Sequence, residues 1–133
     1  MVTFSDNQLC PCGSGKALAM CCGAFIRDQQ PVPTAEQLMR SRYTAFVLGE
    51  AEYLKQTWHE QTRPSSLQMD DVRWLGLKIR SVQQGGIGDE QGKVEFIARY
   101  KLNGRGYRLH EISRFVRQGG QWFYLDGEQK DQA

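Results

Sequence analysis

The stretch VEFIARYKLNG, residues 94–104, carries the alternation that decides the fold. Apolar side chains recur in it at every second position, at Val94, Phe96, Ala98, Tyr100 and Leu102. A period of two is typical of a strand with one buried face, and the Asn-Gly that follows favours a tight hairpin turn. The stretch therefore predicts a strand that turns back at residues 103–104 into an antiparallel partner.

Three more strands are expected around this hairpin. One precedes it, with Leu75, Leu77 and Ile79 alternating on its inner face, and a glycine-rich loop joins the two. The partner strand covers 107–117 and ends at two glycines, and a short last strand follows at 121–125. Consecutive strands joined by short turns predict an antiparallel meander of about four strands.

Two helices are expected ahead of the sheet. Thr34 and Gln37 form a capping-box pattern at the start of the first helix, and Gly49 is placed to end it. The second helix covers about residues 50–58. Helices followed by strands define the α+β class, so we expect helices packed on a bent antiparallel sheet whose inner face forms a core or a pocket.

Length and composition bound the class of protein. A chain of 133 residues supports one compact domain with a small appendage, and 40% hydrophobic and 24% charged residues are near the globular average. The net charge of +2 gives no long-range field for nonspecific nucleic-acid binding. No apolar run is long enough for a bilayer, and the first residues lack a secretory signal pattern. We therefore expect a soluble cytoplasmic protein with neither a membrane nor a specific nucleic-acid partner.

All four cysteines lie in one segment, CPCGSGKALAMCCG at residues 10–23. Cys10 and Cys12 form one arm, Cys21 and Cys22 form the other, and eight residues separate the arms. Two short arms that supply four thiolates are typical of a tetrahedral zinc site, and four protein ligands leave no open position for catalysis. Zinc is therefore the predicted cofactor, in a structural role.

The residues between the arms suit such a site. Gly13 and Gly15 are expected to adopt positive φ and to turn their amides toward the sulfur atoms, while Lys16 offsets the thiolate charge. Residues 16–20 are good helix formers that deliver the second arm from a short helical turn. A phosphate-binding loop is excluded, because the glycine spacing is wrong and Ala17 stands where Ser or Thr is needed.

Two other uses of the cysteines stay open. Disulfides within an arm are strained, because Cys21 and Cys22 are adjacent and one residue separates Cys10 from Cys12, but pairing between the arms is not excluded. A thiol redox sensor would require exposed cysteines of low pKa without a metal.

The cysteine segment resembles a known motif. Cys-Pro-Cys-Gly-Ser-Gly-Lys, followed after the spacer by Cys-Cys-Gly, is similar to the SEC-C zinc motif at the C-terminus of the SecA translocation ATPase. The resemblance implies that the four cysteines bind zinc and that the folded motif recruits a protein partner, as SecA recruits the SecB chaperone and the ribosome. The basic face that usually follows the lysine is replaced by Ala-Leu-Ala at 17–19, so the SecB-binding surface does not carry over.

The rest of the chain also resembles a family. LMRSRYTAFVLG at 38–49, Tyr53-Leu with TWH at 57–59, WLGL at 74–77 and WFYLDG at 122–127 are similar to the YchJ-like bacterial proteins. The resemblance covers the chain nearly end to end and implies a SEC-C motif joined to a domain of the nuclear-transport-factor-2-like (NTF2-like) fold. That fold serves ketosteroid-isomerase-type enzymes as well as silent binding or dimerisation modules, so the fold alone does not settle function.

A short connector divides the chain. Residues 29–33, QQPVP, are stiffened by two prolines. The expected domains are therefore the SEC-C motif at 1–27 and the NTF2-like domain at 33–133.

Few side chains suit acid–base chemistry, and the catalytic candidates are Glu111 and His59. Glu111 lies on an apolar strand face, where a carboxylate could act as a general base, although we favour a structural ion pair with Arg42. His59 is expected at a helix end or on the surface. His110 precedes Glu111 in its strand, so these two side chains point to opposite faces and do not act as a pair.

The candidate pocket residues are Arg42, Tyr43, Trp58, Trp74, Tyr100 and Ser113. Tryptophans without interleaved basic patches are expected in a core or a pocket wall and not in a nucleic-acid stacking platform. One of Arg40 and Arg42 could anchor an acidic ligand, although a solvated helix face is the favoured position for them. A basic cluster around the predicted hairpin is the best candidate for an acidic partner: Arg99, Lys101, Arg105 and Arg108.

Two functions from different classes follow. The first is a non-enzymatic zinc-binding adaptor or ligand-binding protein, in which the zinc motif contacts another protein and the main domain offers a pocket for a small molecule or a homodimer face. The alternative is a small isomerase or hydrolase that uses Glu111 or His59 in the pocket.

Overall fold

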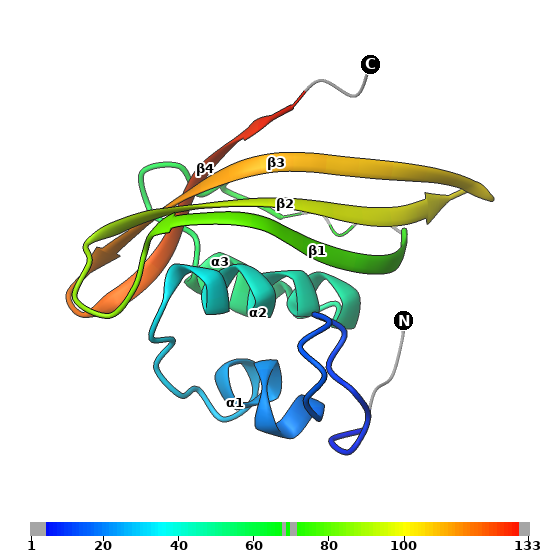
Figure 1. Ribbon diagram of the computed structural model, residues 1–133, viewed down its shortest axis with the longest axis horizontal. Helices are drawn as coiled ribbons and strands as arrows, with labels where there is room; N and C mark the ends of the chain where they lie inside the picture. Colours follow the sequence, from blue (N-terminus) through cyan, green and yellow to red (C-terminus); the bar gives the residue numbers. More distant parts are fainter. Residues whose placement is uncertain (1–4, 68, 70–71, 131–133) are drawn as a thin grey trace.

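The computed structural model describes residues 5–67, 69 and 72–130 of the chain. It contains a sheet of four antiparallel strands in the order β1-β2-β3-β4 (Figure 1). The strands are β1 (Arg73–Gln84), β2 (Gln91–Leu102), β3 (Arg105–Gln118) and β4 (Gln121–Gln129). The predicted meander is confirmed.

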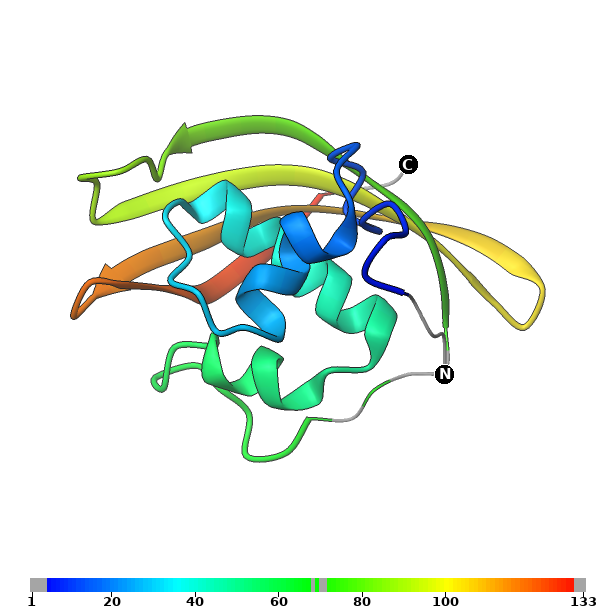
Figure 2. The same cartoon turned by 90° about the horizontal axis from the view of Figure 1, so that it is seen from below.

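The helices lie on one side of this sheet. They are the 3-10 turn η1 (Leu18–Met20), α1 (Cys22–Ile26), α2 (Ala35–Leu48) and α3 (Ala51–Gln56). Figure 1 shows three layers: the curved sheet, then α2 and α3, then α1 on the far side of α2, and Figure 2 shows α1 lying across α2. The expected α+β class is confirmed. In the part of the chain that the structure describes, no helix is long and apolar enough to cross a bilayer.

The helix α2 begins and ends where the sequence predicts. Thr34 Oγ1 accepts a hydrogen bond of 3.1 Å from the backbone N–H of Gln37, which satisfies one of the free amides at the helix start. Gly49 follows the last helical residue with a φ of 76°, the left-handed conformation that glycine adopts without steric cost. This long helix forms the middle layer between the sheet and the N-terminal segment.

The second helix is shorter than predicted. α3 ends at Gln56, because the segment after it pairs with the last strand. Tyr124 donates its backbone N–H to Thr57 O at 2.7 Å, and His59 donates its backbone N–H to Tyr124 O at 2.8 Å. These long-range bonds hold Trp58 in a parallel bridge to Tyr124 in place of another helical turn.

The first strand differs from the prediction at Leu75. A register shift between Trp74 and Gly76 inserts an extra residue opposite β2. The bulge packs Trp74 against the core together with Leu77 and leaves Leu75 41% exposed. The expected inner-face position of Leu75 is therefore wrong, since simple alternation does not allow for a bulge.

The β1–β2 hairpin anchors the start of α2. Gly85 accepts a hydrogen bond of 2.9 Å from the backbone N–H of Ala35. Gly92 lies so close to Gly85 that a Cβ on Gly92 would lie 2.5 Å from the Gly85 Cα. Only glycines permit this approach of hairpin and helix.

One hydrophobic core joins the N-terminal segment to the main domain. Its buried members include Cys10, Cys12, Leu18 and Cys22 as well as Leu38, Tyr43, Phe115 and Trp122. Trp122 Nε1 donates a hydrogen bond of 3.1 Å to Pro33 O, which fixes the connector beside β4. The N-terminal segment is therefore packed on α2 and does not hang free.

Candidate functional site

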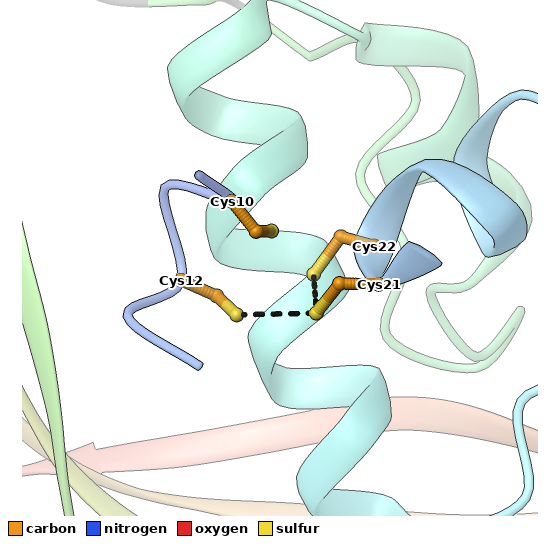
Figure 3. Close-up of side chains that lie close together, drawn as sticks. All are labelled: Cys10, Cys12, Cys21 and Cys22. Atoms are coloured by element: carbon orange, nitrogen blue, oxygen red, sulfur yellow. Dashed lines mark hydrogen bonds between the residues drawn. The ribbon is translucent and has the colours of Figure 1, made fainter. Parts of the chain in front are cut away.

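The four cysteine side chains meet between the N-terminal loop, the start of α1 and the outer side of α2 (Figure 3). All four Sγ atoms lie within 4.8 Å of one another. Cys12 Sγ is 3.7 Å from Cys21 Sγ, and Cys21 Sγ is 4.0 Å from Cys22 Sγ. An ion with bonds of about 2.3 Å to four tetrahedral sulfurs places those sulfurs about 3.8 Å apart. The cluster therefore has the dimensions of a tetrathiolate metal site.

The bonding state and burial of the cysteines bear on the two alternatives to a metal site, which are disulfides and a redox sensor. All four are free, so the disulfides left open by the sequence are not formed. Cys10, Cys12 and Cys22 are buried, and Cys21 is partly exposed. A redox sensor needs exposed thiols, whereas a structural metal site is closed.

The backbone of the loop brings the first arm to the second. Gly13 and Gly15 have φ values of 83° and 85°, as predicted from their position between the arms. The loop is closed by a hydrogen bond of 2.8 Å from the backbone N–H of Cys10 to Lys16 O. The turn η1 and the helix α1 then present Cys21 and Cys22 at their junction.

Three polar side chains surround the sulfur atoms. Ser14 Oγ lies 3.1 Å from Cys21 Sγ, and Thr44 Oγ1 lies 3.6 Å from Cys10 Sγ. Arg40 Nη1 lies 3.9 Å from Cys12 Sγ and donates a hydrogen bond of 2.9 Å to Cys12 O. Such neighbours orient metal ligands and balance thiolate charge.

Sequence reasoning missed Arg40 and Thr44, which it placed on a helix without a role at the cysteines. They are one helical turn apart, so the i, i+4 spacing was the only available signal. Among the described residues the Lys16 ammonium makes no hydrogen bond or ion pair, whereas Arg40 Nη1 lies 3.9 Å from Cys12 Sγ and is the cation placed to offset thiolate charge. The solvated face expected for Arg40 holds only in part: its Nε donates to Glu36 Oε2 at 3.0 Å and the side chain is 24% exposed, while its Nη1 reaches Cys12.

Proton sharing within the cluster favours replacement of the protons by a cation. Contacts with the thiols of Cys12 and Cys22 lower the pKa of Cys10 to about 3. Contacts with Cys10 and Cys12, together with burial, raise the pKa of Cys22. Four thiols in contact cannot all ionise without a compensating positive charge, which a divalent metal ion supplies.

A second site lies on the other side of α2, where a cavity of about 380 Å³ opens between the helix and the sheet. All six candidate pocket residues line it, and so does Glu111: Arg42, Tyr43, Trp58, Trp74, Tyr100 and Ser113. This volume is within the range of pockets that take small organic ligands. The structure therefore brings the candidate pocket residues together in one place.

Arg42 is the buried cation of this cavity, at 4% exposure. Its Nη1 donates to Leu54 O at 2.8 Å and to Thr57 Oγ1 at 2.7 Å, and its guanidinium lies 4.6 Å from the Tyr124 ring and 5.1 Å from the Trp58 ring. Burial lowers the pKa of Arg42 to about 10, so the side chain still carries its charge at neutral pH. Arg42 therefore lines the cavity, as expected of a pocket candidate, and the solvated helix face favoured for it is wrong.

Glu111 reaches the same cavity from β3 but does not pair with Arg42. Its Oε2 accepts hydrogen bonds from Ser113 Oγ at 2.7 Å and from the Tyr124 hydroxyl at 3.3 Å. The prediction of an ion pair between Glu111 and Arg42 is therefore wrong. Arg42 Nη1 donates to acceptors at the end of α3, and the Glu111 carboxylate accepts from two hydroxyl groups. A Cβ at Gly127 would overlap the Glu111 carboxylate in its present position, so glycine on the neighbouring strand leaves room for this conformation of Glu111.

Aromatic rings form the apolar end of the cavity. Trp74 is their centre, with ring centroids 5.7 Å from Tyr43, 6.0 Å from Phe46 and 5.3 Å from Tyr100. Edge-on and tilted contacts of this kind stabilise the apolar wall of the cavity.

The two histidines lie outside the cavity. His59 is 5% exposed, its Nδ1 accepts from the backbone N–H of Gln61, and its Nε2 lies 3.1 Å from Gln118 Oε1. The expected surface or helix-end position of His59 is wrong, because its segment pairs with β4. His110 Nε2 lies 2.7 Å from Glu95 Oε2 on the face opposite Glu111, as the strand alternation predicts.

The predicted basic cluster lies toward the free end of the sheet. Arg99 and Arg108 are direct neighbours across β2 and β3, and both are exposed. Lys101 and Arg105 flank the Asn103-Gly104 turn of the same hairpin and are exposed as well.

Comparison with known proteins assigns both parts of the chain. Residues 34–127 match the family model of the YchJ middle NTF2-like domain, and residues 7–24 match the SEC-C motif. The fold and the cysteine site thus define a protein that joins a SEC-C motif to an NTF2-like domain.

Relatives and solved structures agree with this class. A UPF0225 protein from Chromobacterium violaceum is 48% identical over 89% of this chain and 90% of its own length, and one from Methylibium petroleiphilum is 53% identical over 90% and 87%. The solution structure of a SEC-C motif containing protein from Rhodopseudomonas palustris is 32% identical, with a TM-score of 0.81 over 92% of this chain and 98% of that one. A crystal structure of a SEC-C motif containing protein from Psychrobacter arcticus is 25% identical, with a TM-score of 0.75 over 96% and 86%. The chain belongs to the YchJ-like UPF0225 family.

Proposed function

We propose that this protein is a non-enzymatic binding protein in which a structural zinc ion fixes the SEC-C motif on α2 and the cavity takes a small ligand. The observation that supports the proposal is that α2 contributes side chains to both the cysteine cluster and the cavity. Arg40 and Thr44 contact the cysteines on one side, and Arg42 and Tyr43 line the cavity on the other. A metal ion that holds this helix therefore also holds one wall of the ligand site.

The chemistry of the cysteine cluster favours zinc as the ion. Four thiolates at tetrahedral spacing suit Zn²⁺, and the closed, mostly buried arrangement suits a structural site. Reduced cysteines also favour the cytoplasm as the location. Elemental analysis of protein purified without chelator tests the proposal, which expects one zinc per chain and a large loss in Cys21→Ser. Metal-free protein with a well-ordered N-terminus would overturn it.

A protein partner at the SEC-C motif is the second part of the proposal. Leu9 and Met20 belong to the motif and are 67% and 78% exposed. Exposed large apolar side chains on a small, rigid motif support a contact surface for another protein. In capture of partners from a cell lysate, we expect the Met20→Ser variant to retain zinc but to lose the partner that the unaltered protein captures. The Cys21→Ser variant should lose both the zinc and the partner. Capture that survives both changes would place the contact elsewhere.

An isomerase or hydrolase remains the alternative, and one observation favours it. Glu111 presents a carboxylate to the cavity beside Ser113 and Tyr124, which is an arrangement suited to a general base. Glu111→Gln discriminates the two functions, because the amide retains the shape but cannot take up a proton. Loss of a turnover activity in a Glu111→Gln variant that still binds the ligand would identify an enzyme.

A further inference from the structure

Arg42 faces the cavity with half of its guanidinium unused. Both of its hydrogen bonds start from Nη1, and Nε and Nη2 have no acceptor among the described residues. Among the described residues, Trp58 Nε1 is the one side-chain nitrogen or oxygen that is fully buried and has no hydrogen-bond partner, so Nε and Nη2 of Arg42 are not fully buried. Nε and Nη2 of Arg42 therefore keep contact with open space. Since Arg42 is 4% exposed and lines the cavity, that space is the cavity.

The unused edge is the one that recognises carboxylates. Nε and Nη2 of an arginine lie side by side and can donate two parallel hydrogen bonds to both oxygens of a carboxylate. This chain uses the same edge elsewhere: Arg114 Nε and Nη2 each donate to an oxygen of Asp126 at 2.6 Å. No carboxylate of the described residues lies within ion-pair distance of Arg42. A buried cation that has no paired anion within the described ranges favours an anionic ligand.

Glu111 adds a second requirement. Its Oε2 is held by Ser113 and Tyr124, while Oε1 has no donor in the described ranges. The ring of Tyr124 lies against Arg42 and its hydroxyl contacts Glu111, so the two charges flank one side chain. A plain carboxylate bound at Arg42 would approach this second anion, which is unfavourable. A ligand with a hydrogen-bond donor beside its carboxylate satisfies both residues.

The apolar end of the cavity sets the body of the ligand. Phe96 pairs with Glu111 across β2 and β3, and Tyr100 pairs with Trp74 across β1 and β2. Phe96 and Tyr100 are four residues apart on one strand, which spans about 13 Å. The cavity therefore runs from the charged pair to the aromatic wall around Trp74.

We propose that the cavity binds a small organic acid that has an aromatic body and a hydroxyl or amino group next to its carboxylate. The carboxylate binds Nε and Nη2 of Arg42, the neighbouring donor binds Glu111 Oε1, and the body packs against Trp74. This inference rests on the proposed ligand-binding function and names its ligand class.

Four compounds with the same phenyl body separate these contacts. Phenyllactate carries a carboxylate and a hydroxyl, phenylalanine a carboxylate and an amino group, 3-phenylpropionate only a carboxylate, and 3-phenylpropanol no carboxylate. Each is titrated into the zinc-loaded full chain and followed by calorimetry and by tryptophan fluorescence, since Trp58 and Trp74 line the cavity. We expect phenyllactate or phenylalanine to bind most tightly, and 3-phenylpropanol about tenfold or more weakly than 3-phenylpropionate. The first two compounds distinguish a hydroxy acid from an amino acid.

Variants assign the contacts to residues. Arg42→Lys keeps the positive charge but loses the paired donors, so affinity for the acids should fall about tenfold while 3-phenylpropanol is unaffected. Arg114→Lys, at an arginine that uses the same edge on the exposed outer face, is the matched control and should leave binding unchanged. Glu111→Gln should reduce the difference in affinity between phenylalanine and 3-phenylpropionate, because the variant loses the carboxylate that accepts from the amino group. Circular dichroism checks that each variant is folded, and if Arg42→Lys unfolds, the comparison of compounds on the unaltered chain still decides.

The outcomes separate this inference from the function on which it rests. Equal affinity for 3-phenylpropanol and 3-phenylpropionate would overturn the ligand class and leave a ligand-binding cavity standing. Failure of all four compounds to bind the folded, zinc-loaded chain would contradict the ligand-binding function itself.

Discussion

Arg40 and Arg42 stand two positions apart on α2 and reach opposite sides of it. At about 100° per residue, two positions turn a side chain to the other face of a helix. Arg40 therefore contacts Cys12, while Arg42 lines the cavity. The Arg42 side is covered by the sheet, whereas the Arg40 side is covered in part by the SEC-C motif and leaves the Arg40 side chain 24% exposed. The two arginines thus serve two different sites.

Removal of the Arg40 side chain should weaken metal binding. Its guanidinium is the cation closest to the cluster in the described part of the chain, and loss of such a neighbour typically lowers metal affinity about tenfold or more. Competition with a chromophoric zinc chelator measures the affinity of Arg40→Ala. Arg80→Ala, an exposed arginine of β1, is the control that should behave like the unaltered protein. Equal affinity in both variants would contradict a role for Arg40 at the metal site.

The start of α2 is held from two directions. The Thr34 side chain caps the first turn, and the carbonyl oxygen of Gly85 in the β1–β2 hairpin accepts a hydrogen bond from the backbone N–H of Ala35. A cap and a tertiary contact at one helix end fix its direction as well as its first residue. The position of this element matters because both sites are built on it.

Loss of the cap should destabilise the whole domain. Thr34→Ala removes the acceptor for the Gln37 amide, and we expect the free energy of unfolding to fall by about 1 kcal/mol. Urea unfolding measures the change. Thr34→Ser keeps the hydroxyl and should retain most of the stability, so equal losses in the two variants would show that the hydroxyl does not cap the helix.

The molecule as a whole is organised by a core that crosses both parts of the chain. Cys12 and Cys22 of the SEC-C motif belong to the same buried cluster as Leu38 of α2 and Phe115 of β3. A core that spans two sequence segments couples their stability, because loss of order in one exposes apolar surface of the other. Metal binding and ligand binding are therefore expected to be linked.

Removal of the metal tests this linkage. Structural zinc contributes folding free energy, so a chelator should lower the midpoint of thermal unfolding and should also weaken binding of carboxylate ligands in the cavity. Calorimetry with and without chelator, followed by readdition of zinc, measures both effects in one preparation. A lower midpoint of thermal unfolding together with unaltered ligand affinity would show that the two sites are independent.

If the homodimer face expected of the main domain is the outer face of the sheet, association of two copies should depend on salt. Arg99 and Arg108 are exposed side by side on this sheet, and Lys101 is close by on the same hairpin. Two copies that meet there bring like charges together, so added salt should strengthen association. Sedimentation at low and high salt measures it, and a chain that stays monomeric at both would rule out this dimer.

Local patterns account for much of the fold. The alternation of residues 94–102 depends on the period of a strand, the capping box on neighbours three residues apart, and the cysteine arms on spacings of one or two residues. Such features are set by interactions within a short stretch, so the sequence alone reveals them. The pocket residues were predicted from residue type, and the structure gathers them around one cavity.

The sequence by itself determined the order of helices and strands, both ends of α2 and the two pairs of cysteines that form the cluster, because each depends on short-range spacing. Only the tertiary structure decided the bulge at Leu75, the early end of α3 and the partners of Arg40 and Arg42. Those outcomes depend on contacts between segments distant in the chain. Their free energies appear only when the SEC-C motif, α2 and the sheet pack together, and no local pattern carries them.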